Sequence, residues 1–366
     1  MHVRHVVRQF APNIGGMEDA VAQLAAHLRS EHNISGSVVT LNRSFNDLDC
    51  HLPRTGEHLG IPIRRIPFRG STRYPIAPSI LKEVGEADIV HVHGIDFFFD
   101  FLAATRWLHR RPLVASTHGG FFHTNFASTA KRAWFTSITR LSARSYARLF
   151  GSSENDTATF RRIAPRQTIA IENGVNIAKW HDAGAAKPCP TMVFIGRFSV
   201  NKDVPALIRL VAALGEPWRL IVAGQPSDLT ADDLHAAAEV NGVAGRVEIH
   251  VGGDDAALRA LISQASYVAS ASRYEGFGLS VIEGMSAGLV PILRPIPPFQ
   301  RLVERTGSGL LVDMDDPFGA ARQVRAFHEG AAEGGREGAI VGASGFGWTG
   351  VAARFAAEYR EVLARQ

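Results

Sequence analysis

The sequence has 366 residues, of which 46% are hydrophobic and 20% charged, a composition typical of a folded globular protein and not of a disordered chain. This length suits two domains of ordinary size better than a single core. The two cysteines, Cys50 and Cys189, are far apart and have neither metal-ligand nor redox spacing, which argues against a disulfide framework and favours a reducing compartment.

The net charge of +4 is unevenly distributed along the chain. Residues 1–180 contain 22 Lys and Arg against 14 Asp and Glu, whereas residues 181–366 contain 17 against 21. The stretch 101–150 has eight basic residues and no acidic one. A basic half of this kind favours a phosphate-bearing partner, such as anionic lipid, a diphosphate-linked acceptor or nucleic acid, and charge alone does not choose among them.

Short β-rich runs alternate with helix-length amphipathic segments, which indicates βαβ units and parallel sheets. The first run is interrupted by His and Arg, so a buried strand is favoured over a signal peptide, and no apolar run is long enough to span a membrane. In the first half we expect strands at 3–8, 36–41, 88–93, 112–117 and 148–152, and helices near 17–30, 97–110 and 127–147. In the second half we expect strands at 191–195, 219–223, 247–251, 267–271, 290–293 and 309–312.

The alternation lapses between Glu172 and the proline-bounded segment that ends at Pro190, where turn residues gather. The pattern therefore predicts an α/β protein with two Rossmann-like, doubly wound parallel-sheet domains. We expect an N-terminal domain at 1–174, a linker at 175–189, a second domain at 190–347 and a C-terminal helix at 348–366 that crosses back to the first domain. Open α/β sheets bind ligands at the carboxyl ends of their strands, so two such sheets facing each other would form one cleft.

Two motifs follow strands of the first half. The segment Asn-Ile-Gly-Gly (13–16) stands between the first strand and the first helix, where Gly16 would let backbone approach a phosphate or sugar at a helix N-terminus. A tight turn explains these glycines equally well, and they do not match the G-x-G-x-x-G dinucleotide motif. His118 follows the strand at 112–117 and could bond a sugar hydroxyl or assist the charge shift at the reacting carbon, although a single histidine is more often structural.

A third motif, Gly-Arg-Phe (196–198) followed by Asn-Lys (201–202), opens the second domain. Transfer from a nucleotide sugar expels a nucleoside diphosphate, so negative charge grows on the leaving oxygen, and fixed cations stabilise that charge. Arg197 and Lys202 are five residues apart in one strand-to-helix loop and could reach the same diphosphate. The alternative is a pair of solvated loop cations.

The fourth motif contains Glu275 and Glu283, with seven residues between them and a helix expected to begin near Leu279. Glu275 would then lie in the loop and Glu283 about one turn inside the helix. One carboxylate could accept hydrogen bonds from sugar hydroxyls and the other from a ribose, at roughly 1.5–3 kcal/mol for each bond to a charged group. The backbone N–H groups from Phe277 through Gly278 to Leu279 would face the phosphates.

Together these motifs, with Glu-Asn-Gly-Val at 172–175, resemble the family 4 retaining glycosyltransferases of the GT-B fold, in the order of that family and over nearly the whole chain. The segments at 5–10, 93–98, 116–124, 152–156 and 295–299 further look like the mannosyltransferases of bacterial exopolysaccharide assembly. The resemblance implies transfer of an α-1,3-linked mannose from the donor GDP-mannose to a polyprenyl-diphosphate-linked disaccharide, cellobiosyl-diphosphopolyprenol.

The same resemblance implies the roles of individual residues. The catalytic and diphosphate-binding set is His118, Glu275, Arg197, Lys202 and Ser153, and the remaining donor-binding set is Gly16, Phe277, Gly278, Leu279 and Glu283. Two positions depart from the family pattern. Asp203 stands where the family usually has glycine after the lysine, and we expect it to cap the following helix; Asn176 stands where the family usually has aspartate.

No metal ion or other cofactor is expected. Asp-x-Asp spacing, which holds a divalent ion in transferases of another fold, occurs at Asp47 and Asp49 and again at Asp313 and Asp315. Neither pair lies in the loop with the proposed phosphate ligands, and short acidic spacings are common by chance. We therefore expect activity that survives EDTA.

The acid-free segment predicts a helix with one basic and one apolar face. Its basic residues are Lys131, Arg132, Arg140, Arg144 and Arg148, and its apolar residues are Trp134, Phe135, Ile138 and Leu141. A peripheral helix that docks on an anionic membrane has this composition, and so does an ordinary helix with a solvated basic side. We expect a cytoplasmic protein associated peripherally with the inner face of the cell membrane through its basic N-terminal domain.

Two other functions remain open. The same fold and mechanism could serve a UDP-sugar donor, because few of these residues would read a guanine ring. A nucleotide-sugar-binding protein without turnover is the second, although the joint presence of Glu275, Lys202 and His118 disfavours it. Nucleic-acid binding is disfavoured because the basic residues form no recognised module.

Overall fold

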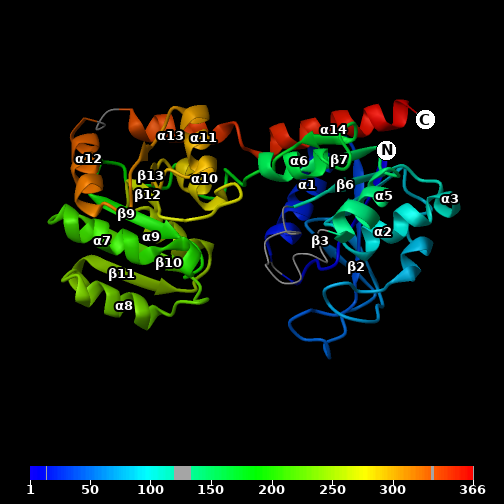
Figure 1. Ribbon diagram of the computed structural model, residues 1–366, viewed down its shortest axis with the longest axis horizontal. Coiled ribbons are helices and arrows are strands. Elements are labelled where there is room, and N and C mark those ends of the chain that lie inside the picture. The colour runs from blue at the N-terminus through cyan, green and yellow to red at the C-terminus, as the bar shows by residue number, and fades with distance from the viewer. Residues whose placement is uncertain (14, 119–132, 331–333, 366) are drawn as a thin grey trace. The chain divides into compact units, whose positions relative to one another are not determined.

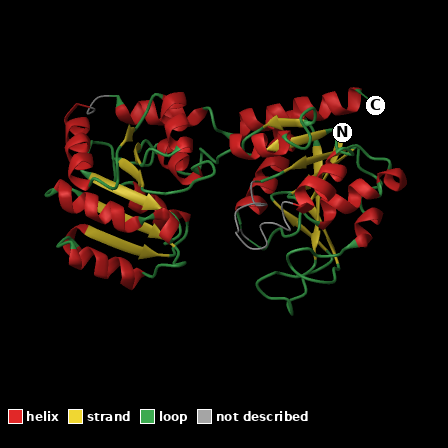
Figure 2. Cartoon of the chain, viewed as in Figure 1, coloured by secondary structure: helices red, strands yellow, loops and turns green. Residues whose placement is uncertain are grey.

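The computed structural model describes residues 1–13, 15–118, 133–330 and 334–365. The chain forms two compact units, one comprising Met1–Gly174 with Trp348–Gln366 and the other comprising Val175–Gly347. Each unit has its own sheet covered by helices (Figures 1 and 2). The chain therefore passes between the units twice, after Gly174 and after Gly347.

The first unit is built on an eight-stranded sheet with the order β3-β4-β2-β1-β5-β6-β7-β8. All neighbours are parallel except β3, which pairs antiparallel with β4 at one edge. The five strands expected from the sequence are confirmed, whereas the β3–β4 hairpin and β8 were not predicted. The strands are β1 (His2–Val6), β2 (Ser35–Leu41), β3 (Thr55–His58), β4 (Ile61–Ile66), β5 (Ile89–His93), β6 (Leu113–Ser116), β7 (Arg148–Gly151) and β8 (Thr168–Ala170).

The helices of the first unit lie between these strands. They are α1 (Gly16–His32), η1 (Pro78–Lys82), α2 (Phe97–Ala104), α3 (Arg106–His109), η2 (Phe135–Thr139), α5 (Arg140–Ala143) and α6 (Glu154–Arg161). The single helix expected at 97–110 is two helices that meet at Thr105. Of the helix expected at 127–147, residues 127–132 lie outside the described residues, and the rest forms η2 and α5 before turning at Arg144.

The second unit has a six-stranded parallel sheet with the order β11-β10-β9-β12-β13-β14. Numbered within the unit this is 3-2-1-4-5-6, the order of dinucleotide-binding Rossmann domains. All six expected strands are present: β9 (Thr191–Ile195), β10 (Arg219–Gly224), β11 (Val247–Val251), β12 (Tyr267–Ser270), β13 (Val290–Leu293) and β14 (Leu310–Leu311). Their helices are η3 (Val200–Lys202), α7 (Val204–Leu214), α8 (Ala231–Val240), η4 (Ala244–Arg246), α9 (Asp255–Ile262), α10 (Leu279–Ser286), α11 (Pro297–Thr306), α12 (Pro317–Gly330) and α13 (Gly335–Ser344).

Residues 175–189, which we expected to form a linker, lie within the second unit. Trp180 is 2% exposed and packs with Val175 and Ala183 in the core of that unit. A buried indole removes a large apolar area from water, so this segment is fixed to the unit that follows it.

The C-terminal helix α14 (Trp348–Ala364) crosses back to the first unit, as expected. Its buried side chains, among them Phe355 and Tyr359, pack in one cluster with Val3 of β1 and Phe150 of β7. Arg148 at the start of β7 pairs with Glu358 at 2.7 Å. Figure 1 shows α14 along this sheet, and α14 packs against α1.

Candidate functional site

In the second unit, the strand order reverses between β9 and β12. A crevice opens at the carboxyl ends of the strands at such a point, and ligands of open α/β sheets bind there. The loop after β9 holds Arg197 and Lys202, and the loop after β12 holds Glu275 and leads to Glu283. The fold thus brings Lys202 and Glu275, 73 residues apart in the chain, to the same end of neighbouring strands.

The loop after β9 is held by contacts with the end of β10. The Gly196 N–H donates to the carbonyl of Ala223 at 3.0 Å, and the N–H of the buried Phe198 donates to the carbonyl of Gln225 at 2.8 Å. A Cβ on Gly224 would lie 1.8 Å from the Gly196 carbonyl oxygen, so this approach requires glycine. Arg197 stands between the two anchored residues with its side chain exposed.

Lys202 and Glu275 form an ion pair between the two loops, through Lys202 Nζ and Glu275 Oε2. The two side chains are 20% and 19% exposed. The Ser272 hydroxyl lies 3.5 Å from the same carboxylate oxygen. The predicted phosphate ligand and the predicted sugar ligand are therefore in direct contact.

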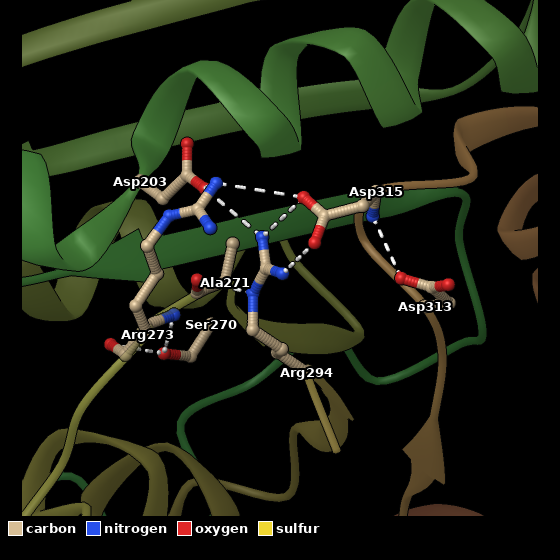
Figure 3. Close-up of polar contacts among 8 residues, drawn as sticks. Asp203, Ser270, Ala271, Arg273, Arg294, Asp313 and Asp315 are labelled. Atoms are coloured by element: carbon tan, nitrogen blue, oxygen red, sulfur yellow. Dashed lines mark hydrogen bonds and ion pairs between the residues drawn. The ribbon is translucent and has the colours of Figure 1, made fainter. Parts of the chain in front are cut away.

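Asp203 stands at the N-cap position of α7, but its side chain does not cap the helix. The expectation of a cap is wrong, because the carboxylate instead lies 2.8 Å from Arg273 and 3.0 Å from Arg294 (Figure 3). Its φ of 48° is left-handed, a conformation that glycine adopts without strain. The glycine usual in the family at this position fits that backbone.

The second Asp-x-Asp pair belongs to the same network of charges. Asp315 accepts hydrogen bonds from Arg294 at 2.7 and 3.3 Å, and the bond from Arg294 is the main cause that lowers the pKa of Asp315. Asp313 accepts the N–H of Asp315 at 2.9 Å (Figure 3). The exposed first pair has the same local hydrogen bond, since Asp47 accepts the N–H of Asp49 at 3.2 Å.

The helix α10 begins where the sequence placed it, at Leu279. Gly278 is its N-cap with φ 84°, and a Cβ there would lie 2.9 Å from the ring of Phe299. The N–H groups of Val281 and Ile282 donate to the Gly278 carbonyl, which leaves the N–H groups of Leu279 and Ser280, at the very start of α10, to bind an anion. Glu283 lies about one turn inside the helix and is half-buried, and Phe277 packs edge-on against Phe346 at 5.7 Å between ring centroids.

The remaining predicted site residues, Gly16, His118 and Ser153, belong to the first unit. Gly16 is the first residue of α1, and a Cβ there would meet open space. Ser153 is the N-cap of α6, where its hydroxyl accepts the N–H of Asp156 at 3.2 Å. Residue 14 and residues 119–124, which complete the two motifs of this unit, lie outside the described residues.

His118 ends a row of bonded histidines that the sequence analysis did not identify. His118 Nε2 lies 3.0 Å from His93 Nδ1, and His93 Nε2 lies 3.0 Å from His5 Nδ1. Burial lowers the pKa of His118 to about 4 and that of His5 to about 3, so both rings are neutral near pH 7. His118 has φ 50°, a left-handed conformation that is strained for a side chain of this size.

His91 lies against the same row, with 3.9 Å between its ring centroid and that of His93. Within the described residues, His5, His91 and His93 form the one group of three ionisable side chains that could hold a metal ion. His91 already bonds the Tyr359 hydroxyl at 2.6 Å and the Ser116 hydroxyl at 2.8 Å. The sequence offered only a partial signal, because His5 falls in the first expected strand and His91 and His93 fall in the third.

The helical segment of η2 and α5 exposes part of the predicted basic and apolar surface. Trp134, Ile138 and Leu141 are 43%, 40% and 62% exposed. Two residues assigned to this surface do not belong to it: Phe135 is buried in the core, and Arg148 lies in β7, the strand expected at 148–152, where it pairs with α14. Residues 131 and 132 lie outside the described residues.

A second exposed segment with basic and apolar residues, not singled out from the sequence, lies in α3. Trp107 is 72% exposed and Leu108 is 52% exposed, between the exposed Arg106 and Arg110. Both α3 and α5 pack against α2 (Figure 1). No helix in the described residues is long and apolar enough to cross a membrane.

Comparison with known proteins gives matches over both units. The model of the family "Glycosyltransferase Family 4" matches residues 14–179, and that of "Glycosyl transferases group 1" matches residues 177–333. The chain is 45% identical to the GDP-mannose:cellobiosyl-diphosphopolyprenol alpha-mannosyltransferase of Xanthomonas oryzae pv. oryzae, with 99% of this chain and 97% of that protein covered. It is 43% identical to the protein of the same name from Komagataeibacter xylinus, with 100% and 94% covered.

Among solved structures, the chain resembles the HepE protein of Anabaena in complex with UDP. The TM-score is 0.76 at 18% sequence identity, and the match covers 100% of both chains. At this identity the likeness shows a shared fold of two Rossmann-like units.

Proposed function

Because the chain belongs to the family 4 glycosyltransferases of the GT-B fold, we propose that it transfers mannose from GDP-mannose to a lipid-linked disaccharide, cellobiosyl-diphosphopolyprenol. The linkage formed is α-1,3, with the anomeric configuration retained. One observation carries this proposal: Lys202 and Glu275 meet at the switch point of the second sheet, in a chain 45% identical to a mannosyltransferase named for this donor and acceptor.

The reaction is a displacement on one face of the sugar. The bond from the anomeric carbon to the diphosphate oxygen breaks as the bond to the acceptor oxygen forms, and the acceptor's hydroxyl proton passes to the departing phosphate. Arg197, Lys202 and the N-terminal N–H groups of α10 stabilise the negative charge of the diphosphate. Glu275 accepts hydrogen bonds from the sugar hydroxyls, and Glu283 accepts them from the ribose.

His118 and Ser153 act from the first unit. A neutral imidazole has one donor and one acceptor nitrogen, and the pKa of about 4 keeps His118 in this form. We assign it to a hydroxyl of the transferred sugar, and we assign Ser153 to the reacting groups and Gly16 to the donor, as the family resemblance implies.

The first unit is proposed to bind the acceptor through arginines in the loops after β1 and β2, which lie against the backbone of the loop after β4. Arg8 Nη1 donates to the carbonyl of Arg73 at 3.4 Å, and Arg43 Nη2 donates to that of Phe68 at 3.0 Å. Arg8 Nε also lies 3.0 Å from Asp96. Guanidinium groups bind phosphate through planar pairs of hydrogen bonds, which suits the diphosphate of a polyprenyl-linked sugar.

We assign the protein to the cytoplasmic face of the membrane, bound peripherally. The surface that we call the docking face consists of the exposed residues of α3 and of η2 with α5: Arg106, Trp107, Leu108, Arg110, Trp134, Ile138, Arg140, Leu141 and Arg144. Aromatic and aliphatic side chains enter the headgroup boundary, while arginines attract anionic lipid. A protein that acts on a lipid-linked acceptor has to reach the membrane surface, and the docking face brings it there.

Donor and acceptor are tested together with the purified full-length chain. Radiolabelled GDP-mannose, UDP-glucose and UDP-galactose are each incubated with the lipid-linked disaccharide, and the product linkage is read by NMR. We expect transfer from GDP-mannose alone. Transfer from a UDP-sugar would replace the donor assignment, and donor binding with no transfer from any sugar would favour a binding protein without turnover.

No metal ion is assigned to the reaction, since Arg197 and Lys202 can neutralise the diphosphate and Asp315 is paired with Arg294. We expect the initial rate to be the same after dialysis against EDTA. Loss of transfer on chelation, with recovery on adding Mg²⁺ or Mn²⁺, would contradict this assignment.

A further inference from the structure

Arg294, directly after β13, joins the loops at the ends of four neighbouring strands. Its side chain is 9% exposed. Arg294 Nε donates to the carbonyl of Ala271 after β12 at 2.9 Å, and Nη2 donates to Asp203 after β9 at 3.0 Å. Asp315 after β14 accepts from both terminal nitrogens (Figure 3). Because a guanidinium group is planar and rigid, a shift of one partner breaks its bond to Arg294 unless the others move with it.

The loops after β9 and β12 are also paired residue by residue. Asn201 accepts the N–H of Arg273 at 2.9 Å, and its side-chain amide donates to the carbonyl of Tyr274 at 2.8 Å. Lys202 pairs with Glu275, and Asp203 pairs with Arg273 at 2.8 Å. Three consecutive residues of one loop thus contact three consecutive residues of the other.

In the proposed donor complex, Lys202 bonds the diphosphate and Glu275 bonds the sugar. The donor therefore competes with the ion pair that aligns these two side chains in the free protein. What remains between the loops is the pairing through Asn201 and the anchoring of Asp203 by its two arginines. A misplacement of about 1 Å at a reacting centre can cost about 100-fold in rate, so these anchors matter most in the loaded enzyme.

We propose that Arg294 is a positioning residue that keeps Lys202 and Glu275 in register once the donor has separated them. It acts through Asp203 and the carbonyl of Ala271 and does not touch the substrate. The inference rests on the proposed function of these two loops as the donor site. Where the family usually has a flexible glycine, this chain has Asp203, whose side chain is held by two arginines.

The test compares Arg294→Met with Arg246→Met in the full-length chain. Arg246 is a matched control in the same unit, because its half-buried side chain also donates to backbone carbonyls and pairs with one carboxylate, Glu216. The measurements are kcat and KM for GDP-mannose, the Kd of GDP by calorimetry, and Tm. We expect Arg294→Met to lower kcat about 10-fold to 100-fold and Arg246→Met to change Tm alone.

A coupled variant separates positioning from general stability. If Arg294 acts through Lys202, Arg294→Met raises the Kd of GDP in the wild-type background. In a Lys202→Ala background, the same substitution changes the logarithm of Kd by less than half as much. Equal effects in both backgrounds would overturn the proposal, as would kcat values for Arg294→Met and Arg246→Met that agree.

Asp203→Asn provides a milder variant should Arg294→Met not fold, since asparagine tolerates the left-handed backbone. We expect it to lower kcat with Tm nearly unchanged, and an unchanged kcat would overturn the proposal. Wild-type protein that neither binds GDP nor transfers mannose would refute the proposed function instead. Normal transfer by the wild type, together with an unchanged kcat in Arg294→Met, would refute the positioning role alone.

Discussion

At the scale of single residues, the two main charges of the proposed donor site are paired with each other in the free protein. Lys202 and Glu275 form an ion pair between the two loops, and about a fifth of each side chain is exposed. An ion pair that is partly exposed contributes about 0–1 kcal/mol, so a diphosphate with several negative oxygens can displace the carboxylate. The pair keeps both side chains near their working positions while no donor is bound.

The first prediction follows from this competition. Glu275→Gln removes the carboxylate that competes with the diphosphate for Lys202, and we expect the affinity for GDP to rise about two- to fivefold. Transfer falls by about 10-fold to 150-fold, because hydrogen bonds from the sugar to a charged acceptor contribute about 1.5–3 kcal/mol. Calorimetry with GDP and the initial rate with GDP-mannose measure the two effects.

Lys202→Gln is the matched control with the opposite sign for GDP. It keeps a polar side chain of similar length and removes the cation, so GDP should bind more weakly than to wild type. If Glu275→Gln instead weakened GDP binding, Glu275 would not be the group that Lys202 leaves when the nucleotide arrives.

The sequence placed the residues of the proposed site in their loops and helix, but it did not identify their partners. Spacing placed Glu275 in a loop and Glu283 one turn into α10, and the helix does begin at Leu279. The role expected for Asp203 failed because its arginine partners follow β12 and β13, 70 and 91 residues further along the chain. Local pattern carries no information about such distant contacts.

At the scale of elements, β1, β5 and the end of β6 place His5, His93 and His118 in one hydrogen-bonded row. Parallel register sets His5 beside His91 and His93 beside Ser116. The rings lie in a buried layer, and burial lowers the pKa of each, to about 3 for His5 and about 4 for His118. Uncharged rings can accept and donate along the row without mutual repulsion.

The second prediction concerns stability in acid. An unfolded histidine titrates near pH 6.5, so between about pH 6.5 and pH 4 the unfolded chain binds protons that these folded histidines do not. The stability they contribute is present above that window and is lost as the pH falls through it, by about 1.4 kcal/mol per pH unit for each ring that stays neutral. Urea unfolding followed by tryptophan fluorescence at pH 7, 6 and 5 measures the slope.

His5→Gln isolates the histidine contribution to that slope. Burial raises the pKa of Asp96 and of Asp100 in the same unit, and this effect has the opposite sign, because the folded chain then holds the extra proton. Removing His5 should reduce the slope by one proton while leaving the aspartates in place. A slope identical to that of wild type would mean that His5 is protonated in the folded protein at pH 5.

The third prediction tests the docking face. Replacing Trp107 and Leu108 by serine removes the exposed apolar tip of α3, and we expect flotation with anionic liposomes to fall severalfold, because each buried CH₂ contributes about 0.8 kcal/mol. Arg140→Gln with Arg144→Gln should weaken binding by about 1 kcal/mol per charge and make it less sensitive to salt.

The matched control is Arg161→Gln with Arg162→Gln, two exposed arginines at the end of α6, outside this face. Two results would contradict the docking face. One is equal flotation of the wild type and all variants, and the other is equal flotation of the wild type with neutral and with anionic liposomes.

At the scale of the whole molecule, alternating strands and helices predicted two Rossmann-like sheets and the return of the last helix to the first unit. The β3–β4 hairpin was missed because all four residues of β3 are exposed, so its sequence lacks the alternation of a half-buried strand. The segment at 175–189 looked like a linker because it is rich in turn residues. Its anchor, the buried Trp180, reveals its role only when the core around it is known.

The return of α14 makes the stability of the first unit depend on the far end of the chain. Trp348 is 4% exposed, and a Cβ added to Gly174 would lie 2.4 Å from its indole. In the second unit, Trp218 is likewise buried in the core, with 3% of its surface exposed. Truncating a buried tryptophan to alanine costs about 3–5 kcal/mol, so these two residues allow each unit to be destabilised in turn.

The fourth prediction is that the two units respond separately to these changes. Lys202, Glu275 and Glu283 all belong to the second unit, so GDP should raise the unfolding temperature of that unit, by an amount set by the nucleotide concentration relative to its Kd. Trp348→Ala should lower the transition that GDP does not shift and leave the Kd of GDP within about twofold of wild type. Trp218→Ala should lower the transition that GDP does shift. Scanning calorimetry with and without GDP measures these transitions. A single transition that both variants lower equally would contradict the prediction and show that the two units unfold together. Donor binding would then be coupled to the packing of α14.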